Sequence, residues 1–112
     1  MLKVGIVGST GRVGTLLIDD LKKDSEVQLA GIHVFDKLEK DVPSDVIVTN
    51  DMKVLMDSVD VVIDFSAPSA TEELLTQVID NNVRKPLVIA TTGFSKHQQN
   101  LLIEASKLVP IL

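Results

Sequence analysis

The chain has 112 residues and no cysteine, which excludes disulfide bonds, thiolate metal sites and a cysteine nucleophile. It also lacks apolar runs longer than about one strand, so we expect neither a membrane span nor a signal peptide. A cytoplasmic protein is the default expectation. No metal site is predicted.

Positive charge is also scarce. Eleven lysines and arginines stand against 16 acidic residues, which gives a net charge of -5 and a pI near 4.8. This balance argues against nucleic acid or an anionic membrane as a partner. An anionic ligand would have to be held by local dipoles and one or two cations. A hydrophobic fraction of 45% argues against disorder, and the length fits one domain over residues 1–112.

Short apolar runs alternate with helical patterns along the chain. We predict strands at 2–8, 27–35, 44–50, 59–66, 85–93 and, as a beginning, 109–112. We predict helices at 12–23, 51–57, 69–80 and 95–107. This alternation predicts an α/β fold with a doubly wound, mostly parallel sheet and helices on both faces, which is Rossmann-like.

Two helices carry further detailed expectations. In the first, Val13, Leu16, Leu17 and Leu21 fall at helical spacing and are expected to face the core. Ser69 with Glu72, and Ser95 with Gln98, have the spacing of capping boxes at the starts of the last two helices.

The polar and glycine-rich segments follow predicted strands: "GSTGRVG", "FDK", "DFSAPS" and "ATTGFS". In a doubly wound sheet, ligands bind outside the carboxyl ends of the strands. The first segment is a G-x-x-G-x-x-G variant of the dinucleotide fingerprint. Gly8 would allow a tight exit from the strand, Gly11 would leave room for a pyrophosphate, and Gly14 would let the helix pack closely. Arg12 adds a cation at the helix start.

An acid for the adenosine ribose is expected about 20 residues after the glycines. Asp36 lies 22 residues after Gly14 and is the candidate, and Lys37 beside it would suit a 2′-phosphate. A turn aspartate with a solvated lysine is the alternative, so NADH and NADPH both remain open.

Three stretches together, "VGIVGSTGRVG", "VVIDFSAPSAT" and "KPLVIATTGFSKHQ", resemble the N-terminal domain of dihydrodipicolinate reductase. The resemblance covers essentially the whole chain. It implies an NAD(P)H-dependent reductase of diaminopimelate and lysine biosynthesis that transfers hydride to a cyclic imine derived from 4-hydroxy-tetrahydrodipicolinate. Together with the glycine pattern, it gives these cofactor-binding residues: Gly8, Ser9, Thr10, Gly11, Arg12, Val13, Asp36, Phe65, Ser66, Ala90, Thr91 and Thr92.

The chain departs from the family pattern at two positions. Ala90 replaces the usual glycine, and ungapped counting places the ribose-binding acid at Val34, which Asp36 would have to replace. The resemblance implies that a separate substrate domain supplies the histidines and lysine that bind a small dicarboxylate and donate a proton. Here His33 is expected to be packed and His97 exposed, so no catalytic residue is assigned within this chain.

Alternative interpretations remain for residues and for the whole chain. Asp64 is expected to be a hydrogen-bonded strand-end residue rather than a catalytic one. We interpret the chain as a fragment of a longer protein that forms homo-oligomers. The alternatives are the domain of another two-domain dehydrogenase, such as aspartate-semialdehyde dehydrogenase, and a non-enzymatic nucleotide- or CoA-binding module.

Overall fold

The computed structural model describes residues 1–8, 12–34 and 42–112, with Arg12 and Val13 described as backbone only. Within these ranges the strands are β1 (Leu2–Val7), β2 (Val27–His33), β3 (Ile47–Thr49), β4 (Val61–Asp64) and β5 (Leu87–Ile89). The helices are α1 (Arg12–Lys23), α2 (Met52–Asp57), α3 (Pro68–Asp80) and α4 (Lys96–Ser106). Strands and helices alternate as predicted, although the strands are shorter than the sequence pattern indicated.

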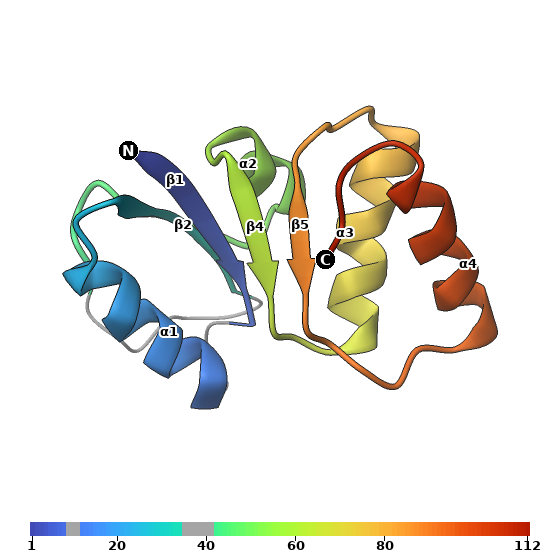
Figure 1. Ribbon diagram of the computed structural model, residues 1–112, viewed down its shortest axis with the longest axis horizontal. Coiled ribbons are helices and arrows are strands. Elements are labelled where there is room, and N and C mark those ends of the chain that lie inside the picture. Colours follow the sequence, from blue (N-terminus) through green and yellow to red (C-terminus); the bar gives the residue numbers. More distant parts are fainter. Residues whose placement is uncertain (9–11, 35–41) are drawn as a thin grey trace.

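The sheet is parallel throughout and has the strand order β3-β2-β1-β4-β5 (Figure 1). The order reverses between β1 and β4, because the chain moves outward from β1 in one direction and later in the other. This is the strand order of a doubly wound, Rossmann-like sheet. The predicted fold class is therefore confirmed.

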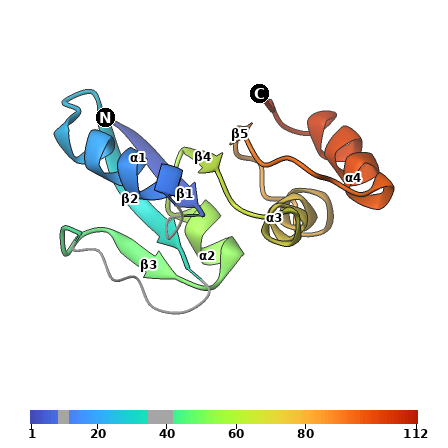
Figure 2. The ribbon, with the colours of Figure 1, turned by 90° about the horizontal axis from the view of Figure 1, so that it is seen from below.

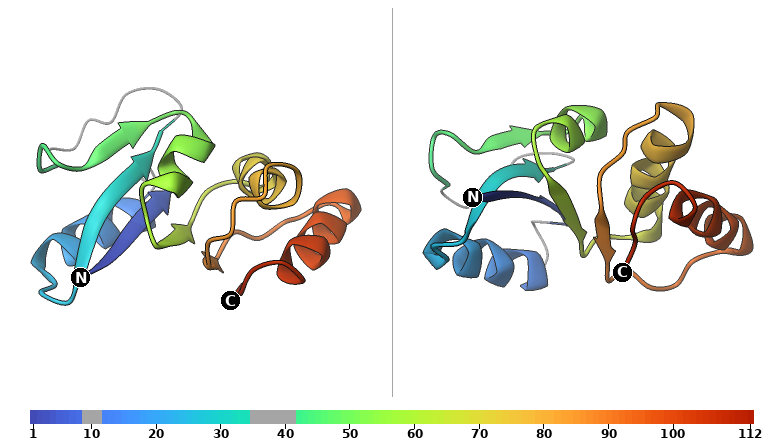
Figure 3. Two further views of the ribbon diagram at one scale, coloured as in Figure 1. Left: turned by 90° about the horizontal axis from the view of Figure 1, so that it is seen from above. Right: turned by 45° about the horizontal axis from the view of Figure 1, so that its top comes forward.

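The last residues of the chain continue this order. Ile111 forms a parallel bridge with Leu87 of β5, and the C-terminus lies beside β5 (Figures 1 and 3). The predicted start of a strand at 109–112 therefore corresponds to strand pairing at the outer side of β5.

Hydrophobic cores lie on both faces of the sheet. On one face, Ile18 of α1 packs with Ile6 and Ile32, which are all fully buried. On the other, α2 and α3 contribute the larger cluster, which includes Leu55 and Leu75, and α4 packs beside α3 (Figure 2). No helix in the described ranges is both long and apolar enough to cross a membrane.

The face that α1 turns toward the sheet differs from the prediction. Leu16 is 60% exposed, whereas Gly14 and Ile18 are buried and Leu17 and Leu21 pack against the core. The apolar residues of this helix extend over more than one stripe. Residue 16 lies about 200° around the helix from the buried residue 14, so Leu16 faces solvent.

The predicted capping box at Ser69 is wrong. The helix begins at Pro68, and its N-cap is Ala67, which makes no side-chain capping bond. Proline suits the first helical position because its φ is already helical and the missing N–H would have no intrahelical partner there. Ser69 therefore lies inside the helix. The capping box of Ser95 and Gln98 at the start of α4 is confirmed.

Candidate functional site

Three loops meet where β1, β4 and β5 end. Val7 is in register with Asp64, and Asp64 with Ile89, so these strands end at the same level. Their arrowheads lie side by side along one edge of the sheet (Figure 1). We call this region, formed by Gly8, residues 64–66 and residues 90–92, the carboxyl edge.

Gly8 lies directly against the loop after β4. Its φ is +95°, and a Cβ atom built there would stand 2.3 Å from the carbonyl oxygen of Phe65 and 2.8 Å from the amide nitrogen of Ser66. The Phe65 amide donates to the carbonyl of Val7 at 2.9 Å, which holds the two backbones together. Only glycine satisfies both the left-handed backbone and the close approach. The end of β1 therefore requires glycine at this position, and the turn that follows it lies outside the described residues.

Asp64 holds the loop after β4 through the hydrogen bonds of its side chain. Its side chain is fully buried, and its Oδ1 accepts hydrogen bonds from the Ser66 amide at 3.0 Å and from the Ser66 hydroxyl. Its Oδ2 accepts from the Thr71 hydroxyl of α3. A buried carboxylate needs such partners to offset the loss of hydration. Asp64 is therefore the hydrogen-bonded strand-end residue that the sequence predicted.

The loop after β5 is tied into the same group of residues. The Ala90 amide donates to the Asp64 carbonyl at 2.9 Å, and the Thr91 hydroxyl oxygen accepts from the Ser66 amide at 3.1 Å. Thr91 is 8% exposed, while Ala90 and Thr92 are exposed. Phe65 and Ser66 are half-buried. The structure thus brings all five of these predicted site residues to one edge of the sheet.

An apolar pocket of about 380 Å³ opens on the α4 side of Thr91. Besides Thr91, its lining includes Phe94, Leu102 and Ile111. Thr91 is therefore shared between the carboxyl edge and this pocket.

The glycine turn is described only in part. Ser9, Thr10, Gly11 and Asp36 lie outside the described residues, as does Lys37. Arg12 is the first residue of α1, and Val13 follows it, so the helix begins a few residues after Gly8. Its N-terminal backbone amides, which lack intrahelical acceptors, therefore begin close to the end of β1.

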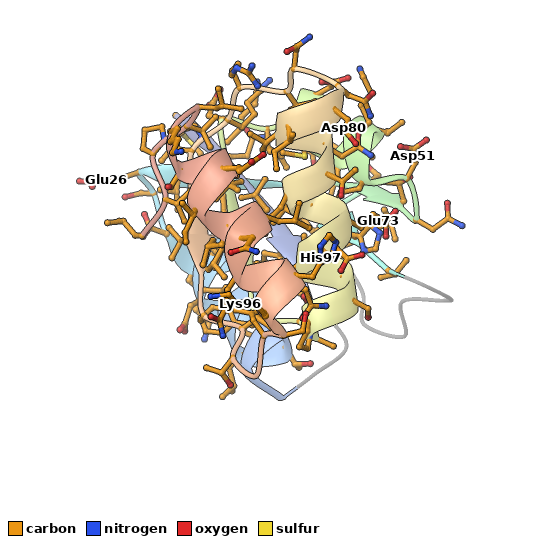
Figure 4. The ribbon with its side chains drawn as sticks, turned by 90° about the vertical axis from the view of Figure 1, so that its right-hand side faces the viewer. Glu26, Asp51, Glu73, Asp80, Lys96 and His97 are labelled. Atoms are coloured by element: carbon orange, nitrogen blue, oxygen red, sulfur yellow. The ribbon has the colours of Figure 1, made fainter. Side chains whose placement is uncertain are left out.

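Other residues considered in the sequence lie away from this edge or inside the core. Val34 is 5% exposed and packs in the cluster under α1, so it has no surface on which to hold a ribose. His33 is 2% exposed in β2, as predicted. His97 is exposed on the first turn of α4, also as predicted (Figure 4). Among the described residues, no group of three or more acidic or histidine side chains is arranged to hold a metal ion.

The sequence did not identify Thr71 as a member of this group. It is fully buried, and its hydroxyl joins α3 to Asp64. A threonine in the first turns of a helix is common, and nothing in its spacing marks it. Only the contact with the buried carboxylate shows its role.

Comparison with known proteins supports a family assignment. The family described as "Dihydrodipicolinate reductase, N-terminus" matches residues 2–112. A protein named 4-hydroxy-tetrahydrodipicolinate reductase from Aliarcobacter butzleri is 69% identical over all 112 residues, and one of the same name from a Sulfurovum species is 54% identical. These matches cover 100% of this chain and 44% and 43% of the two relatives. The chain therefore spans less than half the length of the relatives it matches.

A solved structure supports the fold. The dipicolinate-bound dihydrodipicolinate reductase of Paenisporosarcina sp. TG-14 superposes with a TM-score of 0.75 at 24% sequence identity. The superposition covers 96% of this chain and 43% of that one. At this level of identity the likeness concerns the architecture of the domain.

Proposed function

Because the chain belongs to the dihydrodipicolinate reductase family and matches its N-terminal part, we propose that residues 1–112 form the NAD(P)H-binding domain of such a reductase. The carboxyl edge would hold the dinucleotide. The whole protein would be an NAD(P)H-dependent reductase of diaminopimelate and lysine biosynthesis. When bound, the nicotinamide would supply the hydride, and the protein would supply orientation and shielding from water.

The main support from the structure is the contact between Gly8 and the loop after β4. It places Gly8, which has no side chain, against the loop that carries Ser66, and the Ser66 amide is bonded to the Thr91 hydroxyl oxygen. The helix α1 begins four residues after Gly8, at Arg12. Helix N-termini attract phosphates because their free amides and dipole favour negative charge. Residues 8–13 would hold the pyrophosphate in this proposal. Arg12 would supply a positive charge for the phosphates in a chain whose net charge is negative.

The nicotinamide end would lie over β4 and β5. Phe65, Ser66, Ala90, Thr91 and Thr92 would line this part of the site. Thr91 and Ser66 provide hydroxyl groups, and the neighbouring pocket provides apolar surface. This mixture of a few polar groups with an apolar wall is typical of sites for organic cofactors.

Asp36 would bind the adenosine ribose, because Val34 is buried in the core and is unable to do so. The proposal covers both NADH and NADPH, since Lys37 next to Asp36 suits a 2′-phosphate. Removing the Asp36 carboxylate by Asp36→Ala should weaken binding by about 1–3 kcal/mol, the range of a hydrogen bond to a charged group.

The reaction itself would require the remainder of the protein. We propose that a following substrate domain binds a small dicarboxylate and donates a proton, and that the cyclic imine derived from 4-hydroxy-tetrahydrodipicolinate accepts the hydride. The complete protein would act in the cytoplasm as a homo-oligomer.

The test compares the 112-residue chain with the full-length protein. Titration with NADH and NADPH should show binding to both proteins, whereas only the full-length protein should oxidise the nucleotide in the presence of the imine. Failure of the full-length protein to bind either nucleotide would refute the proposal. Full turnover by the 112-residue chain would refute the assignment of the chemistry to the remainder.

A further inference from the structure

The buried carboxylate of Asp64 determines the hydrogen-bonding direction of its neighbours. The hydroxyl groups of Ser66 and Thr71 both donate to its oxygens, Ser66 to Oδ1 and Thr71 to Oδ2. The Ser66 hydroxyl proton is therefore committed to the interior of the protein. Its oxygen retains lone pairs that can accept a hydrogen bond from a ligand.

The same carboxylate also fixes the position of the loop. The Ser66 amide is shared between Asp64 Oδ1 at 3.0 Å and Thr91 Oγ1 at 3.1 Å, so one N–H joins the ends of β4 and β5. That amide also borders Gly8, at 2.8 Å from the position of a Cβ there. Replacing Asp64 would therefore disturb an amide that contacts all three loops of the carboxyl edge, although Asp64 itself is not exposed to solvent.

Without the carboxylate, the neighbouring hydroxyl groups have other acceptors. The carbonyl of Ala67 lies 3.3 Å from Ser66 Oγ and 3.4 Å from Thr71 Oγ1. Both hydroxyl groups would then be free to turn toward this carbonyl, and the Ser66 oxygen would present a different direction at the surface. The loop would then carry a different arrangement of polar groups.

We propose that Asp64 is a positioning residue of the cofactor site, which acts through Ser66 by holding its hydroxyl as a hydrogen-bond acceptor toward the ribose or amide donors of the nicotinamide half. This inference rests on the proposed function of the carboxyl edge. Asp64 touches no ligand in this arrangement, and its effect on binding is indirect.

The test measures the dissociation constants of NADH and NADPH for the full-length protein and its variants. Asp64→Ala removes both acceptor oxygens and should weaken binding about tenfold, the upper range for one hydrogen bond between the ligand and the Ser66 oxygen. Asp64→Asn keeps one oxygen for Ser66, while its amide can donate to Thr71, whose hydroxyl turns to Ala67. This conservative variant should remain within about threefold of the unaltered protein.

A double-mutant cycle with Ser66→Ala separates positioning from general destabilisation. If Asp64 acts through Ser66, most of the effect of Asp64→Ala on affinity disappears once the Ser66 hydroxyl is absent, because coupled residues are not additive. The matched control is Asp60→Ala, at the opposite end of β4, where the carboxylate accepts from the Lys3 amide at 2.8 Å. This control removes an aspartate hydrogen bond but should leave both dissociation constants unchanged.

The outcomes distinguish the inference from the proposed function. If the unaltered protein binds neither nucleotide, the proposed function fails and the inference fails with it. If it binds and Asp64→Ala binds equally well, or if the effects of Asp64→Ala and Ser66→Ala simply add, the inference alone is overturned.

Asp64→Val provides the test if Asp64→Ala does not fold. It leaves a smaller void but also removes both acceptor oxygens, so it should weaken binding about tenfold, and unchanged affinity would overturn the inference.

Discussion

Replacing Gly8 with alanine should be among the most damaging single-methyl additions in this chain. The new Cβ would stand 2.3 Å from the Phe65 carbonyl oxygen, whereas real Cβ contacts are essentially never closer than 3.0 Å, so the two backbones would have to separate by about 0.7 Å. No side-chain rotation can relieve this contact, because the neighbouring atoms belong to a backbone held by Val7, Asp64 and Thr91.

Two costs combine in the Gly8→Ala variant. Overpacking against a fixed neighbour typically costs about 1–3 kcal/mol. A left-handed backbone adds about 1–2 kcal/mol for a residue with a Cβ. We therefore expect a loss of about 2–5 kcal/mol in the free energy of unfolding, a large part of the 5–15 kcal/mol typical of a folded protein.

Gly93→Ala is the matched control. Gly93 also has a positive φ, +85°, but a Cβ there would have no atom within 4 Å. This variant isolates the backbone cost, about 1–2 kcal/mol. Urea unfolding of the 112-residue chain, followed by circular dichroism because the chain has no tryptophan or tyrosine, gives both values. If Gly8→Ala costs no more than Gly93→Ala, the backbone contact with Phe65 does not constrain the turn and the reasoning is refuted.

Three further predictions concern stability and ionisation. Ser95→Ala removes the capping box of α4 and should lower the free energy of unfolding by about 1 kcal/mol in the same urea experiment, and an unchanged value would mean that the cap is dispensable. Leu75→Ala should cost about 2–5 kcal/mol because the side chain is fully buried between α3 and the sheet; a cost below 1 kcal/mol would contradict the described core. The hydrogen bond and the charge of Asp57 raise the pKa of Lys53 above its ordinary value of 10.5, so the contribution of this pair to stability is present below that value and is lost as the pH rises through the raised pKa. In an NMR titration, Asp57→Asn should lower the pKa of Lys53, and the same pKa in both proteins would show that the pair does not persist in solution.

The order and type of the elements followed from the sequence because several local signals agreed. The bounds of α1, 12–23, match the prediction, and Ser95 capped α4 as expected. The alternation of strand and helix patterns indicated a sheet covered on both faces, and cores lie on both faces. In these segments, residue propensity, hydrophobic periodicity and capping residues all predict the same secondary structure, and tertiary packing did not change it.

Packing decided what the pattern left open. Leu16 and Ile18 both fall on apolar stripes of α1, and only the approach of the helix to the sheet determines that Ile18 is buried and Leu16 exposed. At α3, the helix begins at Pro68, one residue before the predicted cap at Ser69, because the φ of proline suits the first helical position.

The candidate site was predictable as a region but not as a hydrogen-bonded group. The carboxyl ends of parallel strands must share one edge, so Gly8, Ser66 and Thr91 were expected to be near one another. The contact of Gly8 with Phe65 and the bond from Thr71 to Asp64 depend on loop conformations that no local pattern specifies. The roles of Gly11 and Asp36 stay predictions from the sequence.

The pairing of the last residues with β5 has a consequence for shortened forms of the protein. The amides of Leu87 and Ile89 donate to the carbonyls of Pro110 and Leu112, both at 2.9 Å. A chain cut before Pro110 would leave these amides unpaired on an edge strand. Another polypeptide could then pair with them as an added strand, and the chains would self-associate. The apparent molar mass measured by light scattering should therefore rise more steeply with concentration for the truncated chain than for the chain that retains residues 109–112.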